Sequence, residues 1–513
     1  FAAAADIITE TLGTDNVRIG ENAGDSITSG GANNVTIGKN AGTAITTGKK
    51  ATLIGAEAGE ALVDGDNNTA VGYQALTTDT NGEKSVAVGT FALTAQNQSS
   101  LTDTHNTAVG YQAGTSVTTG VSNTLIGARN GDALTVGSYN VAVGDEALGS
   151  EIQGSNSVAV GVGALLNQNV GSATSVNNTA VGHAAGNQVT TGTANTLIGS
   201  LAGDALTVGE LNTAIGVLAL SADDGGSRNT VVGYAAFQSQ NPSGSSVNNM
   251  YNTGLGYGVG SSITTGYYNT FVGGLCGDDT NDGIANTAMG YLALSANCGD
   301  GNTAVGRQAG TVITGSNNTC VGDGAGESIT SGSDNIMIGH DAGSGQVTTS
   351  NDQLFIARSN ASLGTDAVFL YGGNTGALIN GDNSSTFNTV SDERIKKNIV
   401  DSTKGLAEIL QVKIRNFEYR TFDELDDDVK ALNDGKGLNV LNKSGVKTGV
   451  IAQELEEVFP NDVTDLPDGT KNVKIENTQW ALIKAVQELS AKVDTLETEN
   501  TAIKSRLDAL EAE

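Results

Sequence analysis

The cysteines are the most reactive side chains of this 513-residue chain, and it has three: Cys276, Cys298 and Cys320. Their number is odd and they show no Cys-x-x-Cys spacing, so the sequence favours neither a disulfide framework nor a thiolate metal site. Cys276 replaces the alanine that a repeated motif carries three residues after its glycine, and Cys320 takes a strand position before another motif glycine. We therefore predict buried packing thiols, and no bound metal or cofactor.

The histidines and carboxylates also lack the arrangement of a catalytic site. His105 lies at a loop-to-strand junction, while His183 and His340 follow a motif glycine at a variable position, which predicts surface locations. Glycan hydrolysis requires paired carboxylates in a groove, and the acids here are scattered through turns. Residues 278–283 (Asp-Asp-Thr-Asn-Asp-Gly) hint at a calcium loop, but no EF-hand spacing or Gly-Gly-x-Gly-x-Asp repeat supports one. We predict no turnover enzyme in this part of the chain.

The charge of the chain excludes several classes of partner. The formal net charge is −30, with 9 Lys/Arg against 31 Asp/Glu up to residue 390 and 17 against 25 beyond it. A surface of this sign does not attract nucleic acid phosphates or an anionic membrane. No run of 18 apolar residues occurs, so the sequence predicts no membrane insertion. The acidity favours solubility of a long surface that does not bundle.

One short motif dominates the first 340 residues: Asn or another small residue, two residues, an aliphatic residue or Met, and Gly. Most of the repeats are spaced by 17 residues, and a fixed short period over such a length predicts a solenoid. Nineteen coils stacked at the strand spacing would make a rod of roughly 90 Å. The motif glycines are Gly20, Gly38, Gly55, Gly72, Gly89, Gly110, Gly127, Gly144, Gly161, Gly182, Gly199, Gly216, Gly233, Gly256, Gly273, Gly290, Gly306, Gly322 and Gly339.

Each repeat predicts two short strands joined by tight turns. The apolar, β-branched residues before the glycine suit a strand, and the glycine can turn the chain with a positive φ. A second strand is expected in segments such as residues 116–119 (Ser-Val-Thr-Thr). The asparagine recurs at sixteen of nineteen positions, the exceptions being Ala51, Ser85 and Ser157. Stacked amides of this kind are expected to form a ladder along the axis and to satisfy turn backbone groups.

A second period of 72 residues is superimposed on the first. The spacing lengthens to 21, 21 and 23 residues after Gly89, Gly161 and Gly233. Insertions in a solenoid emerge as loops on one face, so we expect three aligned loops at about residues 94–104, 166–177 and 237–251.

The repeat resembles the head repeats of YadA-type trimeric adhesins, with their Ser/Asn-x-Ala-Ile/Val-Gly-x-x-Ala pattern. It is also similar to the Gly-Asn-Thr-Ala-Val-Gly repeats found upstream of phage-type tail-fibre ends. The resemblance covers about residues 12–345, although the adhesin repeats are shorter. It implies a parallel β-roll and three chains packed side by side, which would complete a core that one narrow coil leaves thin.

The composition changes abruptly at Ser391, where lysines, longer helices and the only tryptophan, Trp480, begin. Residues 391–399 (Ser-Asp-Glu-Arg-Ile-Lys-Lys-Asn-Ile) resemble the start of the peptidase S74 family, the intramolecular chaperone domain of phage tailspikes and tail fibres. Residues 449–460 are similar to the Gly-x-Ile-Ala-Gln-Glu…Pro helix of that family, and residues 480–489 lie where it enters a coiled coil.

The last residues show a heptad pattern of their own. The d positions are Leu482, Leu489, Leu496, Ile503 and Leu510, and the a positions are Val486, Val493, Asn500 and Leu507. Such heptads join parallel helices, and a single Asn at an a position fixes their register. The helix seam leaves dimer and trimer open, while the shaft and the family resemblance indicate three chains.

The S74 resemblance implies one chemical reaction, a cut of the chain before the motif serine. It places the scission between Val390 and Ser391, with Ser391 as nucleophile and Lys396 as the base that deprotonates it. A serine hydroxyl needs such help at neutral pH, and a desolvated lysine can give it. Asp392 and Arg394 complete the matched motif and are expected to order the turn. Because the five-residue spacing is not a same-face helical one, a loop or a neighbouring chain would have to bring the pair together.

These observations predict a mainly β protein with a β-solenoid shaft at 1–345, a β-rich connector at 346–390, an α+β chaperone domain at 391–478 and a coiled coil at 479–513. The expected function is a homotrimeric fibre of a phage-type tail that adheres to a host-surface receptor, either glycan or protein. Its N-terminal end would join other virion or filament proteins. The alternative is an extracellular or cell-surface adhesin or filament protein that keeps its chaperone uncut.

Overall fold

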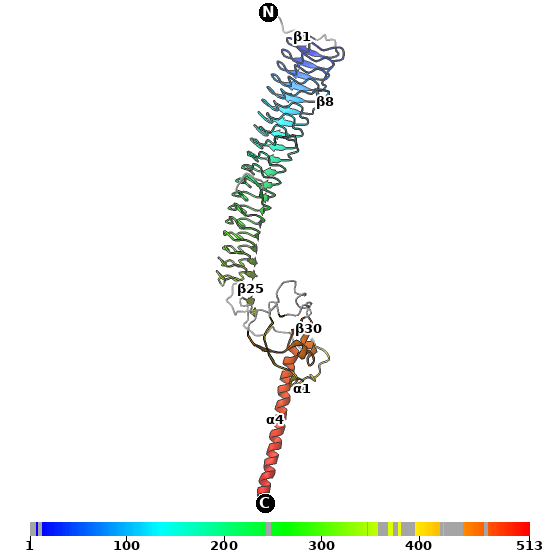
Figure 1. Ribbon diagram of the computed structural model, residues 1–513. Helices are drawn as coiled ribbons and strands as arrows, with labels where there is room; N and C mark the ends of the chain where they lie inside the picture. The colour runs from blue at the N-terminus through cyan, green and yellow to red at the C-terminus, as the bar shows by residue number, and fades with distance from the viewer. Residues whose placement is uncertain are drawn as a thin grey trace. The chain divides into compact units, whose positions relative to one another are not determined.

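The computed structural model describes residues 7–8, 13–242, 248–345, 347–357, 368–372, 378–380, 396–420, 424, 445–465 and 470–512. The chain divides into two compact units, Phe1–Phe387 and Asn388–Glu513. The first is a β-solenoid whose coils each add one short parallel strand to a continuous ladder (Figure 1). The predicted fold class is confirmed: the chain is mainly β and ends in a helix.

The ladder of the solenoid contains twenty strands, all parallel and nearly all three residues long. The strands are β2 (Val17–Ile19), β3 (Val35–Ile37), β4 (Thr52–Ile54), β5 (Thr69–Val71), β7 (Val86–Val88), β9 (Thr107–Val109), β10 (Thr124–Ile126), β11 (Val141–Val143), β12 (Val158–Val160), β13 (Thr179–Val181), β14 (Thr196–Ile198), β15 (Thr213–Ile215), β17 (Thr230–Val232), β19 (Thr253–Leu255), β20 (Thr270–Val272), β21 (Thr287–Met289), β22 (Thr303–Val305), β23 (Thr319–Val321), β24 (Ile336–Ile338) and β25 (Leu354–Ala357).

Antiparallel strands cover both ends of this ladder. β1 (Ile7–Ile8) pairs with β2, and β26 (Val368–Gly372) pairs with β25 and with β27 (Leu378–Asn380). An unpaired edge strand invites pairing with another chain, so these caps protect the two ends of the stack.

The prediction of two strands per coil is wrong for most coils, which contain one ladder strand and then a series of turns; among the described residues, second strands of two residues occur beside the first and third of the longer loops. Residues 116–119, expected as a second strand, have no strand geometry. Gln112 and Gly114 both have φ of 58°, so left-handed residues interrupt the extended backbone just before residue 116. Hydrogen bonds still join the coils there, since the amide of Thr118 donates to the carbonyl of Thr135 at 2.9 Å.

The core of the solenoid is thin and is filled mainly by alanine, leucine and valine. The middle residue of nearly every ladder strand points inward, as Leu125 and Ala142 do on neighbouring strands. The three cysteines are buried and form no disulfide, which confirms the prediction of packing thiols. Burial raises the pKa of the Cys276 and Cys320 thiols to about 12.

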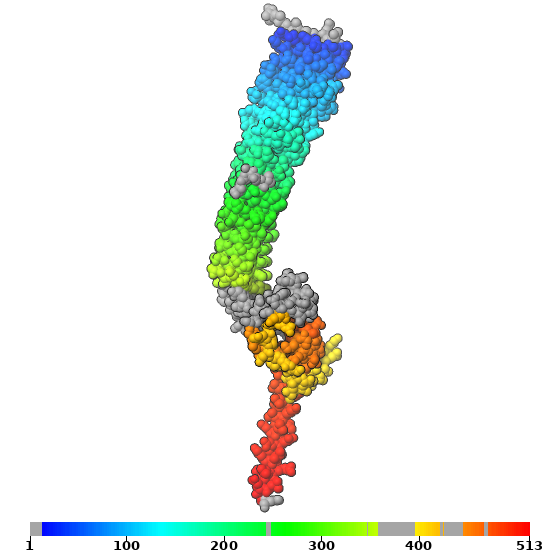
Figure 2. All heavy atoms as spheres, in the orientation of Figure 1, coloured from blue at the N-terminus to red at the C-terminus, as the bar shows by residue number. Residues whose placement is uncertain are grey.

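The residue before each motif glycine faces away from this core. All nineteen are aliphatic or Met, and none is buried within the chain. They form an apolar stripe along the outer face of the ladder: Ile19, Ile37, Ile54, Val71, Val88, Val109, Ile126, Val143, Val160, Val181, Ile198, Ile215, Val232, Leu255, Val272, Met289, Val305, Val321 and Ile338. Figure 2 shows the side chains of successive coils as one continuous surface.

The motif glycine is required by the turn and by the close stacking of coils. Gly144 has φ of 134°, a conformation that other residues rarely adopt. A Cβ atom there would lie 2.5 Å from the carbonyl oxygen of Gly161 in the next coil. Any larger residue would push the two coils apart.

The asparagine ladder predicted from the sequence is present, and it binds mainly backbone groups. In a typical coil, Oδ1 of Asn195 accepts the backbone N–H of Asn212 in the next coil at 3.0 Å. Its Nδ2 donates to the carbonyl of Gly209, in the turn of its own coil, at 2.9 Å. An amide that forms both bonds joins one coil to the next and also closes its own coil; Nδ2 of Asn286, which is buried without a hydrogen-bond partner among the described residues, is an exception. Direct amide-to-amide bonds occur only at a few steps, such as Asn229 to Asn212 at 3.1 Å.

The three longer coils carry a buried polar network that the sequence patterns did not reveal. In the third, Nε2 of Gln240 donates to the carboxylate of Asp223 at 2.6 Å, and its Oε1 accepts from Nδ2 of Asn252 at 2.9 Å. Burial raises the pKa of Asp223 to about 6. The equivalent sets in the other two coils are Asp79, Gln96 and Asn106, and Glu151, Gln168 and Asn178.

Short parallel contacts flank the expected loops. β6 (Gly82–Glu83) pairs with β8 (Thr102–Asp103), and β16 (Gly226–Ser227) pairs with β18 (Asn248–Asn249). A single bridge between Ser155 and Ser175 takes their place at the middle loop.

The second unit contains α1 (Leu406–Ile409), β28 (Arg415–Phe417), β29 (Lys447–Gly449), α3 (Ala452–Glu456), the 3₁₀ turn η3 (Pro460–Asp462), β30 (Val463–Asp465), β31 (Lys471–Val473) and α4 (Glu476–Glu511). β28 pairs with β29 and β30 with β31, both antiparallel. The long helix α4 has 36 residues.

The amide ladder predicts a contrast between two adjacent asparagines. Asn68 is buried: it accepts the N–H of Ser85 at 2.9 Å and donates to the carbonyl of Gly82 at 2.7 Å. Because Asn68→Ala leaves both groups unsatisfied, we expect the free energy of opening around Ser85 to fall by about 3 kcal/mol. Hydrogen exchange of the Ser85 amide measures this.

The exposed neighbour Asn67 provides the control. It has φ of 61°, and alanine occupies the equivalent position at Ala194 with φ of 58°. Asn67→Ala should leave the exchange of Ser85 unchanged, and equal protection in both variants would contradict a structural role for the ladder.

Candidate chaperone and self-cleavage site

The structure describes only one of the residues predicted for self-cleavage. Val390, Ser391, Asp392 and Arg394 lie outside the described residues, and Lys396 is described and exposed. The Ser–Lys pair therefore stays a prediction. The described part of the unit shows instead how the surrounding domain holds the long helix.

A small apolar core joins α3, η3, β30 and the first turns of α4. Its buried members are Leu455, Val458, Phe459, Val463 and Ala481. Leu455 and Phe459 belong to the segment 449–460 that the sequence singled out, so this motif supplies the core on which α4 packs.

Asp462 fixes the beginning of α4. Its carboxylate accepts hydrogen bonds from the backbone N–H and side chain of Asn477, at 2.9 and 2.6 Å. It also accepts from the N–H and hydroxyl of Thr478, at 2.7 and 2.6 Å. Burial acts to raise the pKa of Asp462, but these four bonds outweigh it and the pKa is lowered. A carboxylate at a helix N-terminus satisfies amides that have no partner within the helix.

A second carboxylate ties α1 to the same helix. Oε2 of Glu488 accepts the backbone N–H of Leu406 at 2.9 Å, and Oε2 of Glu408 accepts that of Gly405 at 2.9 Å. Lys404 donates to the carbonyl of Val458 at 3.2 Å and lies over the ring of Phe459. The start of the domain is thus attached to both α3 and α4.

Exposed ion pairs support the strands. Arg415 forms a two-pronged contact with Glu454, at 3.0 and 2.6 Å. Hydrogen bonding from Arg415 lowers the pKa of the Glu454 carboxyl, and the same bond raises the pKa of Arg415.

Neither Asp462 nor Glu488 could be assigned a role from sequence, because their partners lie 15 or more residues away and follow no local spacing.

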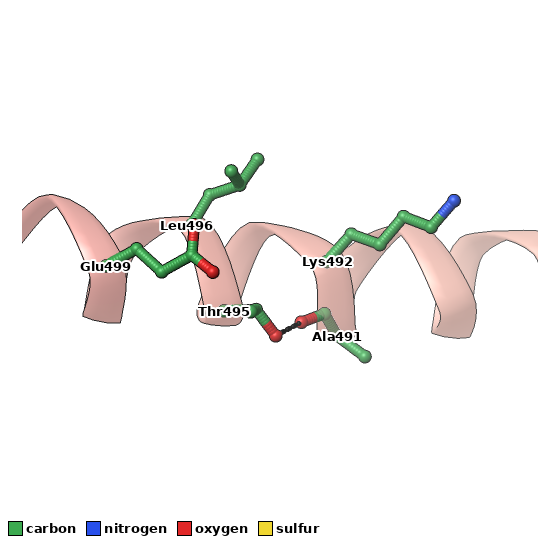
Figure 3. Close-up of a pocket in the computed structure, with 5 residues that line it drawn as sticks. All are labelled: Ala491, Lys492, Thr495, Leu496 and Glu499. Carbon is green, nitrogen blue, oxygen red and sulfur yellow. Dashed lines mark hydrogen bonds between the residues drawn. The ribbon is translucent and has the colours of Figure 1, made fainter.

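Beyond this core α4 is solvent-exposed on all sides in the single chain. The exposed apolar residues include all the predicted d positions and the aliphatic a positions: Leu482, Val486, Leu489, Val493, Leu496, Ile503, Leu507 and Leu510. Figure 3 shows Leu496 and Lys492 projecting from one side of the helix, whereas Thr495 turns back and donates to the carbonyl of Ala491 at 2.9 Å. A seam of this kind has no partner within the described chain.

Comparison with known families identifies this part of the chain. Residues 391–464 match the model of the peptidase S74 family, described as chaperone of endosialidase. This segment is a peptidase S74 domain. No curated protein and no solved structure matches the chain. The protein thus joins a β-solenoid shaft to an S74 domain, as the sequence predicted, and α4 lies entirely beyond the matched residues.

The described residues include no helix that is both long and apolar enough to cross a membrane. They also contain no group of three His, Cys, Asp or Glu side chains that could hold a metal ion.

Asp462 generates a testable prediction for the S74 domain. Asp462→Ala removes four hydrogen bonds to a carboxylate, so we expect the domain to lose about 3 kcal/mol of stability. A lowered pKa means that this contribution is complete above the ordinary aspartate pKa of 3.8 and is lost as the pH falls through the lowered value. Urea unfolding followed by helical circular dichroism measures both effects.

Asp465 provides the matched control, because it is exposed and its carboxylate contacts only Lys471. Asp465→Ala should cost little. If the two variants unfold at the same urea concentration, Asp462 does not anchor α4.

Proposed function

We propose that this protein is the host-binding fibre of a phage-type tail, assembled from three copies with the S74 domain as intramolecular chaperone. The observation that carries the proposal is the S74 match directly after a shaft of repeated coils. Because the coils resemble one another, two copies of the shaft would pack almost equally well in the correct register and in a slipped one. A folded, non-repetitive end can set that alignment before the shaft assembles.

The outer stripe of the shaft supports packing against further copies. Nineteen aliphatic or Met residues in a row leave an apolar surface far longer than monomeric proteins expose. A second copy offers the same stripe at the same spacing, so parallel copies can cover one another along the whole ladder. Assembly would remove this stripe from water.

The charges beside the α4 seam favour a parallel and in-register arrangement. In parallel coiled coils a g residue faces the e residue five positions later on the partner helix. Here three consecutive pairs of this kind have opposite charges: Lys492 with Glu497, Glu499 with Lys504, and Arg506 with Glu511. Slipping the helices by one heptad would oppose Lys492 to Lys504 and Glu499 to Glu511. We propose three copies because the repeat resembles trimeric adhesin heads.

The remaining parts of the proposal concern location and partners. The fibre belongs to a virion, its N-terminal end joins other virion proteins, and its shaft adheres to a host-surface glycan or protein. The acidic surface and the low count of cationic groups agree with a fibre that does not bind nucleic acid.

Self-cleavage would release the chaperone once the fibre has formed. Oγ of Ser391 would attack the carbonyl carbon of Val390 while Lys396 takes its proton, and the acyl group would pass from nitrogen to oxygen. Water would then hydrolyse this ester, leaving a carboxylate on Val390 and a free amine on Ser391. Lys396 is exposed in the single chain, so a neighbouring copy would have to exclude water from it. This requirement would couple the cut to assembly.

A charge exchange tests the parallel helix arrangement. Lys492→Glu places like charges against Glu497 of the other copies, and we expect the thermal midpoint of the assembly to fall. The double variant Lys492→Glu/Glu497→Lys restores an opposite pair and should recover most of the loss. Native mass spectrometry should give three copies for the wild type. A monomeric wild type, or a double variant no better than the single one, would contradict the arrangement.

The scission is tested on denaturing gels of the purified full chain. The wild type should release a fragment of residues 391–513, whereas Ser391→Ala and Lys396→Ala should each remain full length. Lys397→Ala is the matched control, since the neighbouring lysine has no role in the proposed reaction and should not prevent the cut. Full-length bands in every sample would show that this chain does not cut itself.

A further inference from the structure

The tyrosines of the shaft gather in one short region. The chain has 11 tyrosines, and six of them lie within four consecutive coils. All six are exposed, although tyrosine normally buries much of its ring. They are Tyr234, Tyr251, Tyr257, Tyr267, Tyr268 and Tyr291.

Most of this region has no ionisable acid or base other than its tyrosines and one cysteine. Residues 229–277 contain no Asp, Glu, Lys, Arg or His, in a chain whose net charge is −30. The composition there is mainly Gly, Ser, Thr, Asn and Tyr. Rigid aromatic faces surrounded by hydroxyls and amides are typical of surfaces that bind ligands.

Four side chains form a compact cluster at one corner of the coils, which we call the corner cluster: Arg228, Tyr251, Tyr267 and Tyr268. Arg228, Tyr251 and Tyr268 stand just before the ladder asparagine of three successive coils, each with positive φ. The ring centroids of Tyr251 and Tyr268 are 5.6 Å apart with planes inclined by 32°. The ring centroid of Tyr267 lies 4.9 Å from that of Tyr268 with planes inclined by 71°, an edge-to-face arrangement.

Arg228 completes the corner cluster without neutralising a carboxylate. Its guanidinium lies over the ring of Tyr251, 5.7 Å from the centroid, and donates to Oδ1 of Asn249. It has no acidic partner among the residues that the structure describes. Donors of the guanidinium that these contacts do not use can serve a ligand rich in hydroxyl groups.

We infer that the corner cluster is a binding platform for a neutral carbohydrate. A sugar ring has an apolar face, which the exposed phenol rings can stack on, and hydroxyls, which Arg228 and the tyrosine hydroxyls can bind. A polyanionic ligand is disfavoured for two reasons. The protein as a whole is strongly acidic, and the adjoining residues 229–277 supply no cationic side chain that could bind anionic groups. A protein partner usually inserts side chains into pockets, whereas this surface is a narrow strip along one corner. This inference rests on the proposed adhesive function and names its ligand class.

The chain contains its own control for the test. Tyr139 stands at the same corner position with φ of 61° and is 61% exposed, but it has no ring partner in the described chain. Alanine already occupies this position at Ala194 and Ala285, with φ of 58° and 59°. Tyr-to-alanine changes there should therefore leave the coil intact.

The experiment measures binding of the full chain to neutral polysaccharides, namely a glucan, a mannan and a galactan, and to polysialic acid as the anionic comparison. We expect at least one neutral polymer to bind, with little dependence on salt. Tyr251→Ala and Tyr268→Ala should each weaken that binding by about tenfold or more. Tyr139→Ala should not.

Each alternative outcome overturns the inference. Binding restricted to polysialic acid and lost at high salt would indicate an anionic ligand instead. A change of assembly state in Tyr251→Ala, measured by native mass spectrometry, would place the corner cluster between copies. If no polymer binds although the intact fibre adheres to cells, this inference fails and the proposed function stands; if the fibre adheres to no cells either, both fail.

Discussion

The structure of the shaft depends on one interaction, the bidentate hydrogen bonding of a buried asparagine amide. Most of these amides accept the N–H of the equivalent residue in the next coil and donate to a carbonyl in the turn of their own coil, as Asn195 does. Both backbone groups are buried, so leaving either without a partner would be costly. The amide therefore fixes the distance between coils and the closure of each coil at once. A thin core of alanine, leucine and valine suffices because the backbone bonds carry so much of the stacking.

Regular stacking would create a problem of alignment between separate copies, which the proposed role of the S74 domain and α4 would solve. Within one chain every coil stacks on its sequence neighbour, but separate copies that expose the same apolar stripe can pack in slipped registers. The chain is not perfectly periodic: the three longer coils carry loops and buried Asp–Gln–Asn or Glu–Gln–Asn networks, and they recur only every four coils. The charged flanks of α4 repeat on a different length scale. A slip that matched the coils would mismatch the helix.

The S74 domain holds α4 through polar contacts of its N-terminal turns, and it leaves the remainder of the helix exposed. Asp462 binds the first turn, and Glu488 binds the start of α1. The N-terminal turns of α4 are therefore held in place, while the apolar seam farther along the helix is exposed. This arrangement agrees with the proposed role of the domain in bringing copies together, because the apolar seam of α4 is exposed while its N-terminal turns are held in place.

The sequence by itself determined the solenoid, its period, the ladder of asparagines and the S74 domain. Each of these depends on residues repeated at a fixed spacing or on a contiguous motif, and such patterns can be recognised in the linear sequence. The second strand at residues 116–119 was predicted wrongly, since alternation of side chains does not reveal that Gln112 and Gly114 adopt left-handed backbone angles. The tertiary structure was needed to show which buried carboxylates pair with which glutamines, that Asp462 binds the start of α4, and that Arg228 lies over the ring of Tyr251. These contacts join residues 15 or more positions apart, and their distances are set by the stacking of coils and the packing of helices rather than by any local spacing.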